Sequence, residues 1–272
     1  MNYLDQLFSL KDQVAIVLGG TGVLAGTIAE GFARAGARIV VSGRNHERGE
    51  KRVAAIQAAR GTAIFLAAET ASREDLTRVR EETLRQWGRI DILLNGAGGN
   101  APQATVNPER AFSQMTQDAW KDMLDKNFLG GVVYPCQIFG EHMIAQRQGS
   151  IITIVSVSAA LPLSKVPAYS AAKAAALNLT RFLAREWAPF GVRVNAISPG
   201  FFPSEQNKKL LYKNDEELTD RGQDIVGHTP MRRFGKPEEL VAAALWLASD
   251  VASSFVTGAE IRVDGGFTAM TI

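Results

Sequence analysis

A tyrosine and a lysine stand four residues apart in the segment YSAAK, as Tyr169 and Lys173. On a helix this spacing puts both side chains on one face, where an ammonium group can lower the pKa of a phenol from its reference of about 10 toward neutral pH. A tyrosine in that setting can donate and accept a proton. The pair indicates acid–base chemistry, although the same spacing alone is more often found in a surface pair.

Three further polar residues could share this chemistry. Ser156 ends the apolar run IITIVS, thirteen positions before Tyr169, where its hydroxyl could polarise a substrate carbonyl. Ser158 is an alternative for the same role. Asn127 lies within a long apolar helical pattern, where an amide has either a catalytic role or a structural one that bends the helix.

A glycine-rich turn follows the first apolar run of the chain. Gly20, Gly22 and Ala25 satisfy the pattern G-x-G-x-x-A between a strand and a helix. Glycines let the backbone approach a pyrophosphate, and the N–H groups at the helix start attract it. The turn predicts a dinucleotide site, with a turn chosen only for packing as the alternative; its residues are Gly19, Gly20, Thr21, Gly22, Val23 and Leu24.

The end of the second apolar run bears on which dinucleotide binds. A NAD-selective site usually has an acid there for the ribose hydroxyls, but this chain has Gly43 followed by Arg44. Gly43 leaves room, and the Arg44 guanidinium suits a 2′-phosphate, which favours NADP(H) with NAD(H) as the other possibility. A solvated surface arginine is the alternative. Glu69, after the third run, is placed to meet the adenine.

Seven short β-branched runs must position these residues, and helical patterns separate them. The runs cover 14–19, 38–43, 62–68, 90–98, 150–156, 192–199 and 259–266, and the helical patterns include 24–35, 48–59, 73–87, 120–144 and 169–187. Continuous apolar strands joined by helices predict a parallel sheet covered on both faces. Ligands bind such sheets at the carboxyl ends of the strands.

One segment breaks this alternation. Residues 200–236 contain scattered Pro, Gly and charged residues, with only a weak helical signal near 205–212. The segment is too long for an ordinary connection, and we interpret it as a substrate lid. No linker or repeat divides the chain, so we expect residues 1–272 to form a single domain.

Composition excludes several classes of protein. Lys and Arg number 30 against 28 Asp and Glu, a net charge of +2, without a run of five like charges, so no nucleic-acid partner is expected. The longest uncharged apolar runs stay below about 18 residues, so we expect no membrane span. Cys136 is the one cysteine, and no basic-then-apolar leader opens the chain, which indicates a cytoplasmic location. We expect no metal site.

These motifs, in this order and spacing, resemble the short-chain dehydrogenase/reductase family across essentially the whole chain. Those that carry the resemblance are the glycine-rich turn, Asn95-Gly96-Ala97-Gly98, Asn127, Ser156, Tyr169, Lys173 and Pro199-Gly200. The resemblance implies an α/β fold with a single doubly wound Rossmann domain, whose seven-stranded parallel sheet has the order 3-2-1-4-5-6-7 and helices on both faces. Residues 162–169, 199–207 and 228–235 resemble the D-mannonate oxidoreductase (fructuronate reductase) branch. The chain departs from the family in its glycine-rich turn and at Gly43, and the second of these departures puts that branch's usual NAD preference in doubt.

The resemblance also implies roles for individual residues. Tyr169 would donate a proton to a carbonyl oxygen as hydride arrives from the nicotinamide, and Ser156 would hold that oxygen. Lys173 would bind the nicotinamide ribose and keep the Tyr169 pKa low, while Asn127 would position a water. The remaining cofactor contacts would come from Asn95, Gly96, Ala97, Pro199, Gly200 and, at the carboxamide, Ser204.

The expected substrate is a sugar acid of the D-mannonate or D-fructuronate type. The family resemblance also implies that the protein is a homotetramer. The carboxylate of such a substrate needs a cationic partner, which cationic residues in and near the lid could supply. The alternative is that these residues are ordinary surface charges of a solvated lid. The candidate substrate residues are Ser158, Lys165, Glu205, Gln206, Asn207, Arg232 and Arg233. Two other functions stay open: a reductase of 3-ketoacyl groups on a carrier, or of another polyol or ketone, and a dinucleotide-binding regulator without turnover.

Overall fold

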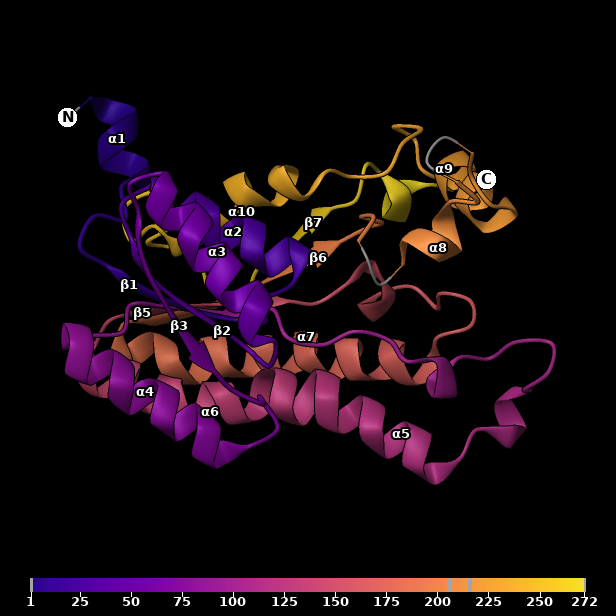
Figure 1. Ribbon diagram of the computed structural model, residues 1–272, viewed down its shortest axis with the longest axis horizontal. Coiled ribbons are helices and arrows are strands. Elements are labelled where there is room, and N and C mark those ends of the chain that lie inside the picture. The colour runs from indigo at the N-terminus through magenta and orange to yellow at the C-terminus, as the bar shows by residue number, and fades with distance from the viewer. Residues whose placement is uncertain (1, 205–206, 215–216, 272) are drawn as a thin grey trace.

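In the computed structural model, which describes residues 2–204, 207–214 and 217–271, seven strands form one parallel sheet (Figure 1). The order β3-β2-β1-β4-β5-β6-β7 confirms the expected topology, and each neighbouring pair is parallel. The strands are β1 (Val14–Leu18), β2 (Arg38–Gly43), β3 (Thr62–Ala67), β4 (Ile92–Asn95), β5 (Gly149–Ile154), β6 (Val192–Pro199) and β7 (Glu260–Val263).

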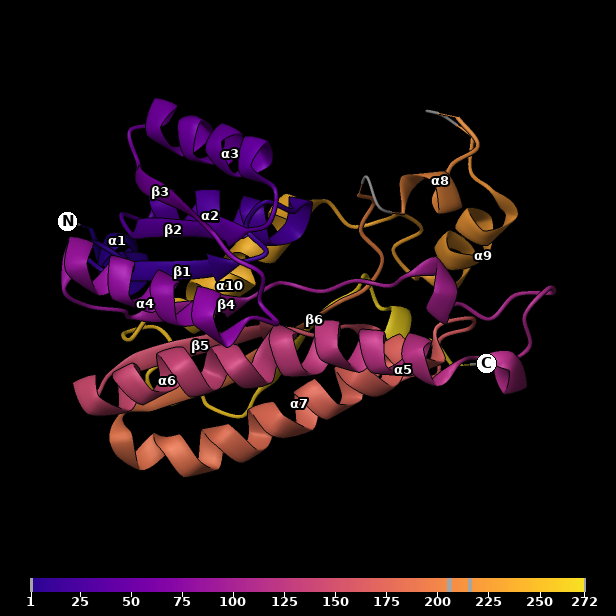
Figure 2. The same ribbon diagram turned by 60° about the horizontal axis from the view of Figure 1, so that its bottom comes forward.

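Helices cover both faces of the sheet (Figure 2). The side chains of β1 alternate between two hydrophobic cores: Ala15 and Val17 face one, while Ile16 and Leu18 face the other. The first core is closed by α2 (Val23–Arg34), α3 (His46–Ala58) and α10 (Val241–Ala248), and the second by α4 (Arg73–Trp87), α6 (Tyr134–Gln146) and α7 (Pro167–Trp187). A short helix, α1 (Tyr3–Phe8), precedes the first strand.

The helical pattern predicted over 120–144 contains a π-helical segment in the structure. Helix α5 (Gln117–Leu124) leads into Asp125–Val133, which is π-helical, and α6 follows without a break. Pro135 sits in the first turn of α6, where it lacks the N–H that a regular helix would bond to the preceding turn. The N–H of Tyr134 instead donates to the carbonyl of Leu129, five residues back. The wider turn therefore accommodates the proline.

Segment 200–236 is more helical than its sequence indicates. The weak signal at 205–212 corresponds to α8 (Lys208–Leu211), with residues 205 and 206 outside the described part of the chain. A further helix, α9 (Asp220–His228), was not predicted, because Gly222 and Gly227 weaken its pattern. Its N-cap is readable in the sequence: the Thr219 hydroxyl accepts a hydrogen bond from the N–H of Gly222 at 3.1 Å.

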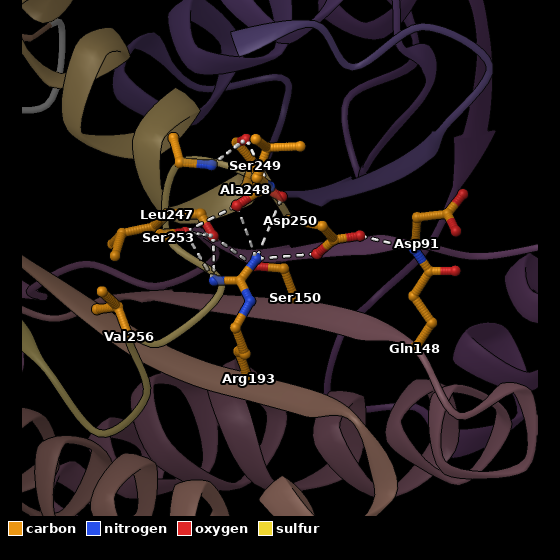
Figure 3. Close-up of polar contacts among 12 residues, drawn as sticks. Asp91, Gln148, Ser150, Arg193, Leu247, Ala248, Ser249, Asp250, Ser253 and Val256 are labelled. Atoms are coloured by element: carbon orange, nitrogen blue, oxygen red, sulfur yellow. Dashed lines mark hydrogen bonds and ion pairs between the residues drawn. The ribbon is translucent and has the colours of Figure 1, made fainter. Parts of the chain in front are cut away.

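A buried arginine joins α10 to the amino end of β6 (Figure 3). The Arg193 guanidinium is paired with Asp250 at 3.1 Å and donates to the Leu247 carbonyl at 2.8 Å and the Ser253 hydroxyl at 2.9 Å. The Gln148 side chain donates to the other carboxylate oxygen of Asp250 at 2.6 Å. These bonds satisfy carbonyl groups that every helix leaves unpaired at its carboxyl end. The cluster therefore lies at the amino ends of the strands, opposite the carboxyl ends where ligands are expected.

Removal of this guanidinium should destabilise the fold. We expect Arg193→Met to lower the free energy of unfolding by about 3 kcal/mol, because it leaves the α10 carbonyls and Asp250 without their donor. The control is Arg85→Met on α4, which removes an exposed arginine paired with Glu82 and should cost less than about 0.5 kcal/mol. Urea denaturation at one protein concentration measures both. Equal losses in the two variants would contradict this role for Arg193.

Candidate active site

The tyrosine and lysine of the YSAAK segment lie near the start of α7. Pro167 occupies the first turn of this helix, where a missing N–H costs nothing. The Lys173 side chain is buried, at 4% exposure, and its Nζ lies 5.6 Å from the centroid of the Tyr169 ring. The i and i+4 spacing therefore does place both groups on one face of the helix.

The carboxyl end of β5 meets this face. Ser156 follows the strand, is 9% exposed and forms a hydrogen bond with the Tyr169 side chain. Its hydroxyl also accepts the N–H of Ser158 at 3.1 Å. Lys173 Nζ donates to the carbonyl of Ile154 at 2.9 Å, which ties the helix to the strand. Tyr169, Ser156 and Lys173 thus come together as the sequence predicts.

Asn127 joins the π-helical segment to the loop after β4. Its side chain is fully buried: Oδ1 accepts the N–H of Gly99 at 2.8 Å, and Nδ2 donates to the carbonyls of Gly99 at 3.1 Å and Met123 at 3.0 Å. A Cβ on Gly98 would lie 2.6 Å from Asn127 Oδ1 and 3.6 Å from Lys173 Nζ. The amide therefore holds the backbone loop beside the lysine, with one Oδ1 lone pair left over.

Burial sets the protonation of the two titratable groups. It raises the pKa of Tyr169, and the hydrogen bond from Ser156 only partly opposes this. The expected lowering of the Tyr169 pKa by Lys173 is therefore not found in the free protein. Burial also lowers the pKa of Lys173 to about 8. At neutral pH the tyrosine keeps its proton and the lysine its charge, a pairing suited to proton donation.

The Lys173 pKa predicts that enzyme activity falls on the alkaline side of its pH profile. The value of kcat/KM for the reduced cofactor reports groups of the free enzyme. Because the Lys173 pKa is lowered to about 8, its ammonium is present below that pH and lost above it. We expect kcat/KM to fall as the pH rises through about 8, and the fall to disappear in Lys173→Arg, whose guanidinium keeps its charge. A wild-type profile that stays level to about pH 9 would contradict the assignment.

The glycine-rich turn forms a cradle at the start of α2. Gly19 has φ +74°, and a Cβ there would lie 2.7 Å from the carbonyl carbon of Gly96 and 2.8 Å from the Ala97 nitrogen. The turns after β1 and β4 thus touch through their backbones. Gly22 caps α2 without a capping side chain, so the first amides of the helix are left for another acceptor. These features fit the pyrophosphate of a dinucleotide.

Two variants can separate the effect of this close approach on cofactor binding from the effect of backbone strain at Gly19. Gly88 has nearly the same φ, +73°, but a Cβ there would meet nothing within 4 Å. We therefore expect Gly19→Ala to weaken NADPH binding at least about tenfold and Gly88→Ala to leave it unchanged, although both strain the backbone by about 1–2 kcal/mol. Fluorescence titration gives the two dissociation constants. A similar affinity in both variants would mean that the apposed turns do not form the cradle.

Two charged residues meet beside this cradle, where the sequence predicts that the adenosine binds. Arg44 Nη1 lies 3.1 Å from Glu69 Oε2, and both side chains are exposed. The space expected beside Gly43 is filled, since a Cβ there would lie 2.7 Å from Thr21 Oγ1. Asn95 is 1% exposed and donates to Thr153 Oγ1 at 3.4 Å, while its Oδ1 has no partner among the described residues.

The turn after β6 is held in place by two local contacts. The N–H of Gly200 donates to the carbonyl of Val263 at 2.9 Å, so the end of Pro199–Gly200 stays beside β7. The Asn207 side chain accepts the N–H of Ser204 at 2.7 Å and donates to the carbonyl of Phe202 at 2.9 Å. Asn207 thus supports the turn that carries Ser204.

The candidate substrate residues are less closely grouped. Arg233 forms a two-pronged ion pair with Glu239 at 2.8 and 2.6 Å, and Arg232 donates to the Gly227 carbonyl. Lys165 is exposed, with φ +72°, in the loop just before α7. The Ser158 hydroxyl is buried without a partner among the described residues. Glu205 and Gln206 lie outside the described residues.

The described residues contain no helix long and apolar enough to cross a membrane. Within the same ranges, no group of three or more His, Cys, Asp or Glu side chains is arranged to hold a metal ion.

A glycine cradle on a doubly wound sheet, with tyrosine, serine and lysine at its edge, defines a nicotinamide-dependent oxidoreductase. Residues 22–268 match a family model described as enoyl-(acyl carrier protein) reductase. An uncharacterized oxidoreductase UxuB of Bacillus subtilis is 42% identical over 269 residues, with 96% of each chain covered. The chain belongs to the short-chain dehydrogenase/reductase family, whose members act on alcohol and ketone groups.

Two solved structures are similar over nearly their whole length. One, from Haemophilus influenzae with bound NAD, carries the provisional name D-mannonate oxidoreductase; it is 36% identical, has a TM-score of 0.92, and the match covers 98% of this chain and 99% of that one. The other is a gluconate 5-dehydrogenase from Burkholderia cenocepacia in complex with NADP and tartrate, 32% identical with a TM-score of 0.86, at 99% and 100% coverage. A nicotinamide cofactor is thus common to both neighbours.

Proposed function

We propose that this protein interconverts a six-carbon keto acid and its hydroxy acid, of the D-fructuronate and D-mannonate type. The observation that carries the oxidoreductase chemistry is the hydrogen-bonded Tyr169 and Ser156 beside the buried Lys173 ammonium. The sugar-acid assignment is supported by the solved neighbours named for D-mannonate and gluconate.

The bound nicotinamide supplies or accepts the hydride. In the reducing direction, Tyr169 donates its proton to the carbonyl oxygen of the substrate, and the raised pKa of this tyrosine keeps the proton available at neutral pH. Ser156 donates a hydrogen bond to the same oxygen. Lys173 holds the nicotinamide ribose, while Asn127 uses its remaining lone pair to position a water that returns a proton to Tyr169.

Lys165 is our first choice for the partner of the substrate carboxylate. Of the three candidate cations, Arg233 already faces Glu239 and Arg232 is bonded to the backbone of α9. Lys165 has no hydrogen bond or ion pair from its side chain in the described structure, and it lies four residues before Tyr169. The unpartnered Ser158 hydroxyl is a donor for the sugar hydroxyls, together with polar residues of segment 200–236, which we propose to act as a lid.

NADP(H) is the proposed cofactor, with NAD(H) as the second choice. Arg44 supports the first, because a guanidinium binds a phosphate through two parallel hydrogen bonds. In the free protein this group pairs with Glu69, so a 2′-phosphate has to take Arg44 over from that carboxylate. The neighbours hold NAD in one case and NADP in the other.

A substrate panel tests this proposal. In the reducing direction, initial rates are measured with NADPH and NADH on uronates and other keto acids, on neutral ketoses and on a 3-ketoacyl thioester. In the oxidising direction, they are measured with the oxidised cofactors on aldonates and polyols. We expect the six-carbon acids to give the highest kcat/KM. The thioester is the arm for the alternative function, which the description of the family model favours. Highest activity on the thioester would replace our proposal by a reductase of carrier-bound 3-ketoacyl groups. No turnover with any compound would replace it by a dinucleotide-binding regulator.

We also propose a homotetramer built through α5, α6 and α7, which is consistent with the exposure of Phe182 on α7 and with the closed symmetry of most oligomers. A monomeric mass in light scattering would contradict it. The cytoplasmic location stays a prediction from the sequence.

A further inference from the structure

Lys126 is a half-buried lysine directly before Asn127 in the π-helical segment. Among the described residues its ammonium group has no hydrogen-bond or ion-pair partner. Partial removal of an ammonium from water costs free energy unless an anion or an acceptor compensates it. The position of Lys126 therefore raises the question of which anion it meets.

Backbone packing shows which way this lysine faces. Gly130 follows Lys126 by four residues, so the two share a face of the helical segment. A Cβ on Gly130 would lie 2.8 Å from the Ala71 nitrogen and 3.0 Å from the Thr70 carbonyl carbon. The face that carries Lys126 is thus pressed against the turn after β3.

The same turn carries the acidic residue of the adenosine end. Glu69 accepts the N–H of Ala71 through Oε1 at 3.4 Å and pairs with Arg44 through Oε2 at 3.1 Å. The helical face that carries Lys126 therefore meets the turn that holds the Arg44–Glu69 pair. Its pKa agrees with this placement: burial lowers it, the charge of Arg44 lowers it further, and Glu69 raises it.

We propose that Lys126 binds the 2′-phosphate of NADP(H) together with Arg44 and is a determinant of cofactor choice. Two cations and one carboxylate leave one positive charge, which attracts a phosphate monoester and gains nothing from an uncharged ribose hydroxyl. A phosphate that takes Arg44 from Glu69 would give Lys126 the anion it lacks. This inference rests on the proposed function, since it assumes a nicotinamide dinucleotide in the cradle.

The test uses two adenosine nucleotides that differ only in the phosphate of interest. Dissociation constants for adenosine 2′,5′-bisphosphate and for 5′-AMP are measured by calorimetry on the wild-type protein, on Lys126→Met and on Lys126→Arg. Lys121→Met is the control, because Lys121 is an exposed lysine on the neighbouring helix α5. The readout needs no turnover, so it does not depend on knowing the substrate.

We expect Lys126→Met to weaken binding of the bisphosphate about tenfold or more and that of 5′-AMP less than about twofold. Lys126→Arg should restore most of the loss, and Lys121→Met should change neither constant. Equal weakening of both nucleotides, or no change in their ratio, would overturn the proposal. If neither nucleotide bound to the wild-type protein, the proposed function itself would fail, and the two failures are thereby distinguished.

Discussion

Tyr169→Phe is expected to lower kcat by about 10²–10⁴-fold, the range that general acid catalysis supplies, while the dissociation constant of the cofactor changes less than about twofold. The substitution removes the hydroxyl that bonds to Ser156 and almost no volume. Lys173, the other titratable side chain of this group, donates its hydrogen bond to the Ile154 carbonyl at 2.9 Å instead. Stopped-flow or steady-state reduction of the best keto acid gives kcat, and fluorescence titration gives the affinity.

Tyr134→Phe is the matched control for this variant. Tyr134 opens α6, and its ring lies under the Arg73 guanidinium at 5.3 Å, so it is not part of the group formed by Tyr169, Ser156 and Lys173. Loss of its hydroxyl should leave kcat close to that of the wild type. If Tyr169→Phe kept more than about a tenth of wild-type kcat, the proton would have to come from another group.

Lys165→Met is expected to lower kcat/KM for a six-carbon keto acid by about 10–150-fold and to leave that for a neutral ketose unchanged. A charge-assisted hydrogen bond to a carboxylate contributes about 1.5–3 kcal/mol, which converts to this range. The effect should fall on the charged substrate alone, because a neutral sugar has no carboxylate to lose.

The control for Lys165→Met is Lys213→Met in segment 200–236. Lys213 already pairs with Glu217 at 2.7 Å, so it has no free charge to offer a substrate. Its removal should change neither kcat/KM. Equal losses for charged and neutral substrates in Lys165→Met would assign Lys165 to the structure of the loop and would return the carboxylate role to Arg232 or Arg233.

Much of the fold is readable in the sequence because each strand is a short, continuously apolar run. Strands buried on both faces, such as β1, need no alternation, and their order follows from the family resemblance. The π-helical segment was not predictable from apolar spacing, since its wider turn depends on where Pro135 removes a hydrogen bond. Helix α9 was missed because its glycines weaken the pattern and its cap depends on one threonine.

The candidate site, like the fold, could be predicted only in part from the sequence. The spacing of Tyr169 and Lys173 is a local property of a helix, so the sequence predicts that they meet. The raised pKa of Tyr169 is not local, because it depends on burial by distant segments. Arg233 looked available to a substrate because its partner Glu239 stands six residues away, in a turn the sequence does not reveal. Lys126 gave no signal beyond its place next to Asn127.

The central claim, that this oxidoreductase acts on a sugar acid, is tested most directly by one ratio: kcat/KM for fructuronate over kcat/KM for fructose, measured on the wild-type protein with the preferred reduced cofactor. The account predicts a ratio of at least about 10, since only the acid can form the charge-assisted contact. A ratio near or below one would contradict the sugar-acid assignment and leave only the membership of the oxidoreductase family in place.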